Sequence, residues 1–598
     1  MKNVLPVIYL LLAGGYDSFA QTNPKVLNTE VATILGGTYT VSLYTATNVI
    51  TDPNIISAGI AGRISTDSLK ADLFALRKFQ NRNMFSDTSS PTRGIGAARR
   101  WVYNKFLQYS NANEGRLKVS YLQFDYDPAS YPCTVSPSIT KHSNIMAVLP
   151  GSQTTNKSLI IVEGHFDSRN ANICDVTGDA FGIGDNATGA ALVMELARVM
   201  SKYTFRNTIV FSVNTGEEQG LIGAKALANY LQSKAVPIKS VNNNDVSGGI
   251  FCGHTASAPG CPFYGNIDST DLRIFSKGDI NSPYKQWARY IKLQYKEQLS
   301  YLVNVPTSIQ IMENEDRTGR GGDHQAFSAL NYTAVRLTQA NEDGSGSSGT
   351  IDRQHNIRDS LGLDKNNDGI EDSLYVDVDY LARNTVINGN AMAMVALGPD
   401  TITLKPSLIT ANRVRVQFSA ATPQNYRVAV RSLTNDWDSV YTITGKTVDT
   451  VVVPYGTNTN FYISAAAMDN NNTESQFSTE YTVSTTLVPL YLEPDTTAPP
   501  PPPTEYYGIQ LMPNKPNPFD ESTMIVVTSG TDIFIDRTWL AISTLDGRIV
   551  QRMKVPLKKG TNEIAYNHGF GMTPGVYICS LLIDGLPVQS TKMVFRDR

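Results

Sequence analysis

The stretch Leu159-Ile160-Ile161-Val162-Glu163-Gly164-His165-Phe166-Asp167 decides the fold. Its first four residues form a short apolar run that favours a buried strand, and His165 and Asp167 follow where that strand ends. Strands buried on both faces are typical of sheets covered by helices on both sides. In open α/β sheets ligands bind at the carboxyl ends of strands. The stretch therefore predicts an α/β fold and the edge at which a functional site lies.

The segments around this strand alternate between helical and extended patterns. Helices are predicted over residues 65–79, 95–109, 187–200 and 221–231, and a further strand over 208–213. Such alternation predicts one α/β domain over residues 65–398, with helices on both faces of its sheet. Residues 21–64 are rich in Thr and Asn, and we interpret them as an N-terminal segment and candidate propeptide.

Five side chains that bind metals well follow predicted strands or turns in this domain: His165, Asp185, Glu218, Asp245 and His355. Two imidazoles and three carboxylates make a suitable donor set for zinc. Asp185 lies in a glycine-rich turn, where small neighbours allow ions to approach and both carboxylate oxygens can be used. The three carboxylates balance most of the charge of two Zn²⁺ ions, leaving about +1 to acidify water. The sequence therefore favours two zinc ions.

Glu217 and Asp167 complete this set. In the pair Glu217-Glu218 the two side chains can point in different directions, so that one binds metal and its neighbour faces the substrate water. Glu217 is then the candidate general base. Asp167 is the candidate carboxylate that orients His165.

The ordered set His-x-Asp, Gly-x-x-Asp-Asn-Ala-x-Gly, Glu-Glu, Asp and His resembles the co-catalytic zinc aminopeptidases of bacterial leucyl and Streptomyces type. The resemblance covers about residues 65–397 and implies a zinc-exopeptidase-like mixed sheet. It implies two zinc ions, with the ligands divided as His165 and Asp245 for one, Glu218 and His355 for the other, and Asp185 as the bridge. It also matches Glu217 to the general base and Asp167 to the orienting acid.

The resemblance implies a peptidase that releases N-terminal amino acids from peptides through a metal-activated hydroxide. Three alternatives stay open: a glutaminyl cyclase-like enzyme with one zinc, a carboxypeptidase of the same superfamily, and a non-enzymatic surface adhesin. The chain departs from the family pattern at Gly184, at Gly322-Asp323-His324 and at Gln354. None of these departures is a ligand, although His324 is a second candidate for the metal.

A possible hard-cation loop follows the last ligand. Oxygen-bearing side chains alternate over residues 364–372, as in loops that wrap around Ca²⁺, and they resemble thrombospondin type 3 or dockerin loops. The candidate calcium ligands are Asp364, Asn366, Asp368 and Asp372. Tyr375 occupies the twelfth position, where an EF-hand has an acid, so a solvated acidic loop is the alternative.

Two all-β domains are predicted after the α/β domain. Residues 401–490 show short alternating strands, and the segment 461–472 resembles the late strand and turn of a fibronectin type III domain. Five prolines mark a semi-rigid linker over 491–505. Residues 506–598 contain Pro513-Asn514-Lys515-Pro516-Asn517-Pro518-Phe519 and a terminal Gly575-Val576-Tyr577, and they resemble the C-terminal sorting domain of type IX secretion.

Composition and the N-terminus predict an exported protein. Residues 1–20 combine Lys2, an apolar run and Ser18-Phe19-Ala20, which is the pattern of a signal peptide, and no segment predicts a membrane span. A net charge of −3 gives no indication of nucleic-acid binding. The predicted partners are peptide substrates and the type IX machinery, with a secreted or surface-attached location. Five cysteines allow two disulfides, predicted as Cys252–Cys261 and Cys133–Cys174, and one thiol.

Overall fold

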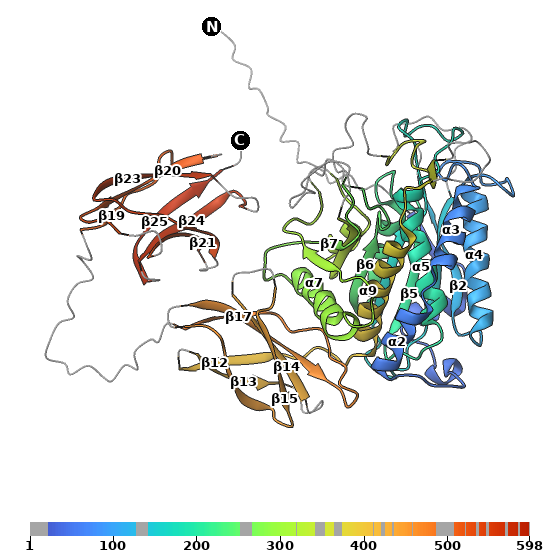
Figure 1. Ribbon diagram of the computed structural model, residues 1–598, viewed down its shortest axis with the longest axis horizontal. Coiled ribbons are helices and arrows are strands. Elements are labelled where there is room, and N and C mark those ends of the chain that lie inside the picture. Colours follow the sequence, from blue (N-terminus) through green and yellow to red (C-terminus); the bar gives the residue numbers. More distant parts are fainter. Residues whose placement is uncertain are drawn as a thin grey trace, which may run out of the picture.

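One large mixed sheet organises the first part of the chain (Figure 1). Among the residues that the structure describes, it has 9 strands in the order β1-β2-β3-β5-β4-β6-β9-β7-β8. These strands span Thr22–Val26, Lys118–Asp125, Lys141–Leu149, Leu159–His165, Thr208–Asn214, Ile238–Asn244, Asp271–Ser276, Ser308–Ile311 and Ala334–Gln339. Because β4 pairs in parallel with both β5 and β6, the carboxyl ends of these three strands meet at one edge. The predicted α/β class is confirmed.

The structure is a computed structural model that describes residues 22–126, 141–251, 266–317, 320–340, 353–363, 373–410, 412–419, 425–432, 436–456, 459–485, 508–520, 522–533, 537–545, 549–567, 572–583 and 586–596. Four predicted features lie outside these residues: the signal peptide, the 491–505 linker, the candidate calcium ligands, and three of the cysteines, Cys133, Cys252 and Cys261. Cys174 is disulfide-bonded. Cys579 is a buried free thiol.

Helices cover both faces of the sheet, and the alternation along β4 shows why. Ile160 and Val162 pack into the core formed with α2–α5, α7 and α9, whereas Leu159 and Ile161 pack into the core formed with α1, α6 and α8. The helices α1 to α9 span Thr29–Leu35, Pro53–Arg63, Thr66–Arg77, Gly94–Ala112, Thr188–Met200, Ile222–Lys234, Pro283–Gln294, His324–Ser328 and Val378–Leu397.

The N-terminal segment belongs to this domain. Strand β1 pairs antiparallel with β2, Val31 and Ile34 of α1 pack in one core, and Ile56 and Ile60 of α2 pack in the other. The α/β unit therefore begins at Thr22 among the described residues, whereas the sequence pattern placed its start at residue 65. Removal of residues 22–64 would unpair an edge strand and expose both cores.

Two units of antiparallel sheets follow, after a two-stranded pair of Gly362–Leu363 and Ser373–Leu374 (β10, β11). In the described part of each unit a 3-stranded sheet packs with a 4-stranded sheet, and both units share one strand order. The first unit has β12 to β18 over Leu404–Thr410, Arg413–Phe418, Asn425–Arg431, Ser439–Thr444, Val448–Val452, Asn460–Met468 and Tyr481–Ser484. The second has β19 to β25 over Gln510–Leu511, Ser522–Ser529, Thr538–Thr544, Ile549–Lys554, Gly560–Asn567, Gly575–Ile583 and Leu586–Phe595.

The first sandwich docks onto the α/β domain through α7. Ala429, Ala466 and Phe477 belong to the same apolar cluster as the sheet and its helices. Around this contact, Arg431 Nε donates to Glu480 Oε1 at 2.8 Å, and Arg289 of α7 lies 3.4 Å from the same oxygen. The sandwich thus shares a core with the α/β domain, whereas the second sandwich has a core of its own.

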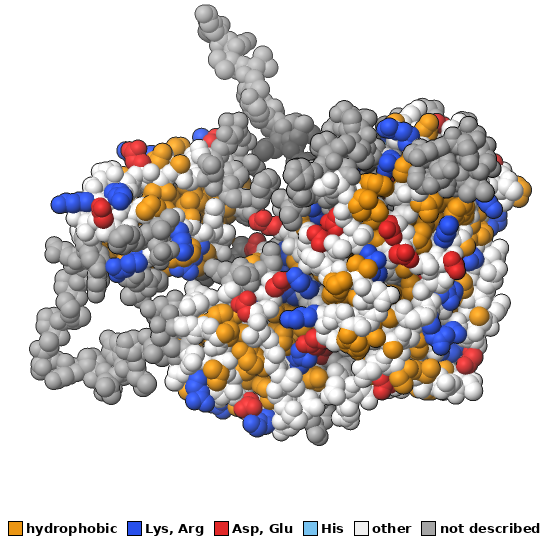
Figure 2. All heavy atoms as spheres, viewed as in Figure 1, with side chains coloured by type: hydrophobic (Ala, Val, Ile, Leu, Met, Phe, Trp, Pro, Cys, Tyr) orange, Lys and Arg blue, Asp and Glu red, His pale blue; other side chains and the backbone are white. Residues whose placement is uncertain are grey.

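Two surface properties bear on the expected partners. No helix among the described residues is both long and apolar enough to cross a bilayer. Figure 2 shows Lys and Arg side chains interspersed with Asp and Glu over the displayed face, without a large area of one sign. That face therefore offers no extended basic surface for a polyanion.

Candidate metal centre

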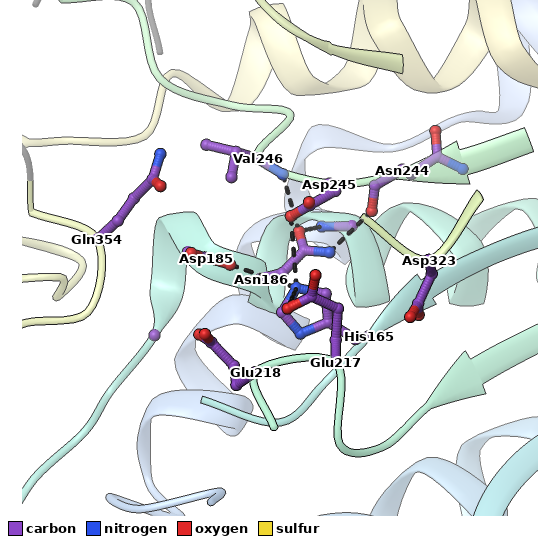
Figure 3. Close-up of polar contacts among 12 residues, drawn as sticks. His165, Asp185, Asn186, Glu217, Glu218, Asn244, Asp245, Val246, Asp323 and Gln354 are labelled. Atoms are coloured by element: carbon purple, nitrogen blue, oxygen red, sulfur yellow. Dashed lines mark hydrogen bonds and ion pairs between the residues drawn. The ribbon is translucent and has the colours of Figure 1, made fainter. Parts of the chain in front are cut away.

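The candidate ligands follow the ends of three neighbouring strands. His165 is the last residue of β4, Glu217 and Glu218 lie just past β5, and Asp245 follows β6 directly. Asp185 lies in the turn Ile183–Ala187 that leads into α5. His355 comes from the loop beyond β9. The structure thus brings together all five ligands expected from the sequence. Figure 3 shows His165, Asp185, Glu218 and Asp245 turned toward one another.

Glycines let these segments approach one another. At Gly189, the second residue of α5, an added Cβ would lie 2.1 Å from the carbonyl oxygen of Asn244, so the helix could not reach the end of β6. Gly216 has a φ of +74°, which favours glycine, and it turns the chain immediately before Glu217. Asn186 then joins turn to strand, since its Nδ2 donates to the Asn244 carbonyl at 2.8 Å.

His165 is the centre of the first donor group. Its Nε2 lies 3.3 Å from Asp185 Oδ1, 3.4 Å from Asp245 Oδ1 and 3.9 Å from Glu217 Oε2. The imidazole is completely buried. Burial opposes a charge on the ring, but Glu217 and the hydrogen-bonding carboxylates outweigh it and raise the pKa of His165 well above its usual value.

His355 is the centre of the second group. Its Nε2 lies 3.0 Å from Glu218 Oε2 and 3.1 Å from Asp185 Oδ2. Burial lowers the pKa of this imidazole, but Glu218 and Asp185 outweigh burial and raise it to about 10. Asp185 therefore presents one carboxylate oxygen to each histidine, which is the arrangement expected of a residue shared by two cation sites.

Asp167 supports both groups from behind. Its carboxylate accepts hydrogen bonds from the backbone N–H groups of Glu217, at 3.3 Å, and Glu218, at 3.2 Å. Asp167 Oδ1 also lies 3.4 Å from Nδ1 of His165. A proton on Nδ1 leaves the Nε2 lone pair facing the donor group, so Asp167 is placed to orient His165 as the sequence indicated.

The donor set fits divalent cations. The donors fall into two groups, His165 with Glu217 and Asp245, and Asp185 with Glu218 and His355, and within each group they lie within 4.8 Å. Glu218 Oε1 is buried and has no hydrogen-bond partner among the described residues. Mixed imidazole and carboxylate donors suit zinc. Cations would also neutralise carboxylates that are otherwise balanced only by two strongly basic histidines and nearby arginines.

Asp359 was missed by the sequence analysis. Its buried carboxylate accepts hydrogen bonds from the backbone N–H groups of Gly184, at 2.7 Å, and Asp185, at 2.9 Å. Its own carbonyl accepts from Ile183 N–H at 3.1 Å. Asp359 therefore ties the loop that carries His355 to the turn that carries Asp185. The family departure at Gly184 has its reason here, since an added Cβ would lie 3.0 Å from Asp359 Oδ1.

Arg336 of β9 was also missed. Its Nε donates to Asp245 Oδ2 at 3.0 Å, and its Nη1 donates to Asp316 Oδ1 at 3.2 Å. The guanidinium thus occupies one oxygen of Asp245 and leaves the other facing His165. No short-range pattern predicts this contact, because 91 residues separate the two partners.

Asp323 and His324 lie behind the donor groups. Asn214 Nδ2 donates to Asp323 Oδ2 at 3.0 Å and to Glu163 Oε2 at 2.8 Å. Burial raises the pKa of Asp323 to about 7, although His165 opposes this. His324 Nε2 lies 2.9 Å from the Glu315 carbonyl oxygen. His324, the second candidate for the metal, is in neither donor group.

A cavity of about 510 Å³ opens above the donor groups. It is lined on one side by the carboxylates of both groups, and it also contains three arginines, which are Arg169, Arg317 and Arg320. Arg169 Nε donates to Glu218 Oε2 at 2.9 Å, and its Nη2 lies 2.6 Å from His355 Nδ1. Metal binding at Nε2 of His355 requires a proton on Nδ1, so Arg169 would then retain only its contact with Glu218.

Comparison with known proteins gives a family. Residues 144–250 match peptidase family M28. A "Probable zinc metalloprotease" of Phaeosphaeria nodorum is 33% identical over 305 residues, which cover 48% of this chain and 60% of that protein. Another protein of that description, from Leptosphaeria maculans, is 32% identical over 337 residues, covering 54% of this chain and 73% of that protein.

The solved structures that resemble this chain include an aminopeptidase. The crystal structure of Legionella pneumophila LapA aminopeptidase aligns with a TM-score of 0.41 and 17% identity, covering 60% of this chain and 78% of that chain. Among the sequence relatives, the chain spans 60% of the length of the Phaeosphaeria protein and 65% of that of a Pyrenophora tritici-repentis protein.

Proposed function

Because this chain belongs to peptidase family M28, we propose that it is a zinc-dependent aminopeptidase that uses two metal ions. One observation carries the proposal: Asp185 directs its two oxygens to two histidines, 3.3 Å from His165 and 3.1 Å from His355. An enzyme with one ion would need only one of these groups. This shared carboxylate supports the peptidase over the cyclase with one zinc.

The proposed ligands are the members of the two donor groups other than Glu217. His165 and Asp245 would hold one Zn²⁺, Glu218 and His355 the other, with Asp185 between them. When bound, the ions supply Lewis-acid polarisation of the scissile carbonyl and acidify water. Three further residues would keep the donors in place. Asp167 holds the N–H groups of Glu217 and Glu218, and Asp359 holds the turn of Asp185. Arg336 holds the second oxygen of Asp245.

Glu217 is the proposed general base. Its side chain lines the cavity and faces the donor groups. Burial, opposed by His165 and reinforced by Asp245, raises the pKa of Glu217 well above its usual value. A carboxylate in this position can take a proton from attacking water and pass it to the leaving amine.

The choice of an N-terminal substrate rests on charge as well as on the family pattern. The carboxylates of Glu217, Asp245 and Glu218 line one wall of the cavity. Glu217 is the carboxylate of this wall that the zinc ions would leave uncoordinated, and it can attract a free α-ammonium group, whereas an N-acetylated peptide offers no charge to it. A carboxypeptidase would instead accept N-blocked peptides.

The experiment that tests this function compares three substrates after loading with zinc: a leucyl peptide with a free N-terminus, its N-acetyl derivative, and a glutaminyl peptide. We expect hydrolysis of the leucyl peptide and none of its N-acetyl derivative, with loss under chelation and recovery when Zn²⁺ is restored. Cleavage of the acetylated peptide from its C-terminus would indicate a carboxypeptidase. Cyclisation of the glutaminyl peptide without hydrolysis would indicate a glutaminyl cyclase. Inactivity on all three would contradict the proposal.

We also propose that the protein is exported. The signal-peptide pattern of residues 1–20 and the motifs of residues 506–598 support secretion through a type IX system. The second sandwich has its own apolar core, which suits a module that is read separately from the catalytic unit.

A further inference from the structure

The two candidate histidines differ in the group that faces their rear nitrogen, Nδ1. Behind His165, Asp167 Oδ1 lies 3.4 Å from Nδ1. Behind His355, the guanidinium of Arg169 takes this place, with Nη2 lying 2.6 Å from Nδ1. A carboxylate accepts hydrogen bonds, whereas a guanidinium only donates them. The two rings are therefore supported by groups of opposite charge and opposite hydrogen-bonding role.

This difference affects how readily each ring can offer Nε2 to a metal. Binding through Nε2 needs the ring proton on Nδ1. Asp167 accepts that proton and so favours the binding form of His165. Arg169 presents an N–H group to Nδ1 of His355, and a proton on Nδ1 would face it with only 2.6 Å between the two nitrogens. The contact between Arg169 and His355 must therefore open before His355 can bind a metal.

Arg169 also contacts the carboxylate of the same donor group. Its Nε donates to Glu218 Oε2 at 2.9 Å, and this is the oxygen that lies 3.0 Å from His355 Nε2. In the other group, Arg336 donates to Asp245 Oδ2, whereas Oδ1 is the oxygen that faces the histidine. Arg169 thus occupies the donor oxygen itself, and Arg336 does not.

The charges around the two groups differ in the same direction. Three carboxylates lie 3.3 to 3.9 Å from His165 Nε2, those of Asp185, Asp245 and Glu217. Two lie 3.0 and 3.1 Å from His355 Nε2, those of Glu218 and Asp185. The side chain of Arg169 is only 20% exposed, so water screens its charge weakly. A cation held beside the second group opposes the binding of a dication there.

We propose that Arg169 acts as a resident counter-cation that makes the Glu218–His355 group the weaker of the two zinc sites. This inference rests on the proposed two-metal function and adds an order of filling to it. The group of His165 and Asp245 is filled first, and the guanidinium has to leave His355 before the second ion is held. The concentration of free zinc then controls the fraction of chains that hold both ions.

The experiment titrates the zinc-free full chain with Zn²⁺ in competition with a chromophoric chelator of known affinity, which gives a dissociation constant for each site. For the wild type we expect two constants that differ by about 10- to 100-fold, the usual effect of a residue that contacts metal ligands. His355→Ala should remove the weaker site and keep the tighter one, which assigns the weaker site to this group.

Arg169→Gln replaces the guanidinium by a neutral amide whose carbonyl can accept from Nδ1–H of His355. It should tighten the weaker site about 10-fold and leave the tighter one unchanged. Arg169→Met is neutral and similar in length, and it should have the same effect if the glutamine variant does not fold. Arg169→Lys retains the charge and should keep the two constants apart.

Arg206→Gln is the matched control. Arg206 also pairs with an acid, at 3.7 Å from Asp400, but it precedes β5 and so lies at the end of that strand opposite to the donor groups. It should leave both zinc constants unchanged. Melting temperatures of the zinc-free proteins show whether each variant is folded.

A weaker second site in the neutral Arg169 variants would overturn the inference and make Arg169 a residue that orients Glu218 for the metal. An unchanged second site in these variants, or two sites of equal affinity in the wild type, would also overturn it, and both results would leave the two-metal enzyme intact. Binding of only one zinc ion by the wild type would instead contradict the proposed function.

Discussion

At the scale of single residues, Glu217 and Glu218 are neighbours with different surroundings. Glu218 contacts His355 at 3.0 Å and Arg169 at 2.9 Å, whereas the contact of Glu217 with His165 is 3.9 Å. The longer distance and the position at the cavity suit a group that handles a proton rather than one that holds a cation. The two roles expected from the adjacent acids are thus compatible with the structure.

Glu217→Gln should keep the fold and the bound metal while lowering kcat by about 10²- to 10⁴-fold, because the amide cannot accept the proton. The measurement is kcat on a leucyl peptide together with zinc content. As a matched change, Gln219→Glu adds a carboxylate two residues along the chain, and in combination with Glu217→Gln it should not replace the lost base. Near wild-type kcat in the Glu217 variant would remove this residue from the mechanism.

Asp359→Ala should weaken metal binding although Asp359 is not a proposed ligand. Loss of the two acceptors for Gly184 and Asp185 N–H frees the turn that carries the shared carboxylate, and supports of this kind change metal affinity about 10- to 100-fold. Competition with a zinc chelator measures this affinity directly.

Asp52→Ala is the control for Asp359→Ala. Asp52 likewise accepts two backbone N–H groups, from Asn54 and Ile55, but it caps α2 away from the donor groups. We expect it to cost about 1 kcal/mol of stability and to leave zinc affinity unchanged. Equal zinc affinity in both variants would show that Asp359 has only a general structural role.

The candidate ligands could be selected from the sequence because they follow short, recognisable local patterns. His165 ends β4, Asp245 follows β6 directly, Glu218 lies just past β5, and Asp185 lies in a glycine-rich turn. The roles of Asp359 and Arg336 could not be predicted from the sequence. Each side chain hydrogen-bonds to a residue more than ninety positions away, and a single sequence carries no record of such pairs.

At the scale of elements, the junction between α7 and the first sandwich contains a buried acid with a displaced pKa. Glu474 accepts a hydrogen bond from Gln294 Nε2 of α7, and its Oε2 lies 3.8 Å from Arg427 Nε. Burial raises the pKa of Glu474 from 4.5 to about 7, while Arg427 opposes this shift. The native junction therefore favours the protonated acid.

The sign of the resulting pH dependence follows from linkage. Between about pH 4.5 and 7 the folded protein holds a proton on Glu474 that the unfolded chain releases, so stability falls as pH rises through this window, by at most on the order of 3 kcal/mol. Glu474→Gln should lose this part of the dependence and melt higher than the wild type at pH 8.

Thermal unfolding at pH 5 and pH 8 measures the effect of Glu474→Gln. Glu30→Gln serves as control, because Glu30 is 41% exposed in its pair with Lys118 and should change the melting temperature little at either pH. An identical difference between the two pH values in wild type and Glu474→Gln would exclude Glu474 as the titrating group.

Element by element, the helices and central strands were predictable from periodicity, and the N-terminal segment was not. α3 begins after Ser65 as expected, with the Ser65 hydroxyl accepting from Ser68 N–H at 3.2 Å. Strand β1 is polar and lies at the sheet edge, so its pattern lacks the apolar run that marked β4. Its place in the sheet depends on pairing with β2. The paired residues, such as Val26 and Leu122, are 96 or more positions apart in the sequence.

At the scale of the whole molecule, the two sandwiches share one strand order but relate differently to the α/β domain. The first sandwich contributes Phe477 to the central core. The ring of Phe477 packs against that of Trp437, with 4.3 Å between the ring centroids. The second has a separate core that includes Phe519 and Tyr566. The first is thus part of the catalytic unit, and the second is proposed to direct export.

Two truncations test this division. Ending the chain after residue 485 should leave zinc content, peptidase activity and melting temperature close to those of the full chain, while the protein stays inside a host that has type IX secretion. Ending it after residue 400 should lower stability or solubility, because it exposes the apolar surface that Phe477, Ala429 and Ala466 cover. Normal export of the first truncated chain would contradict the sorting role.

The central claim is that Asp185 is shared by two zinc ions, and the metal content of the zinc-reconstituted protein tests it most directly. Inductively coupled plasma mass spectrometry on the full chain should give two zinc ions per chain, with activity reaching its maximum only as the second ion binds. Asp185→Asn should reduce the content to one or none. Full activity at one zinc ion per chain, unchanged by the Asp185 substitution, would contradict the account.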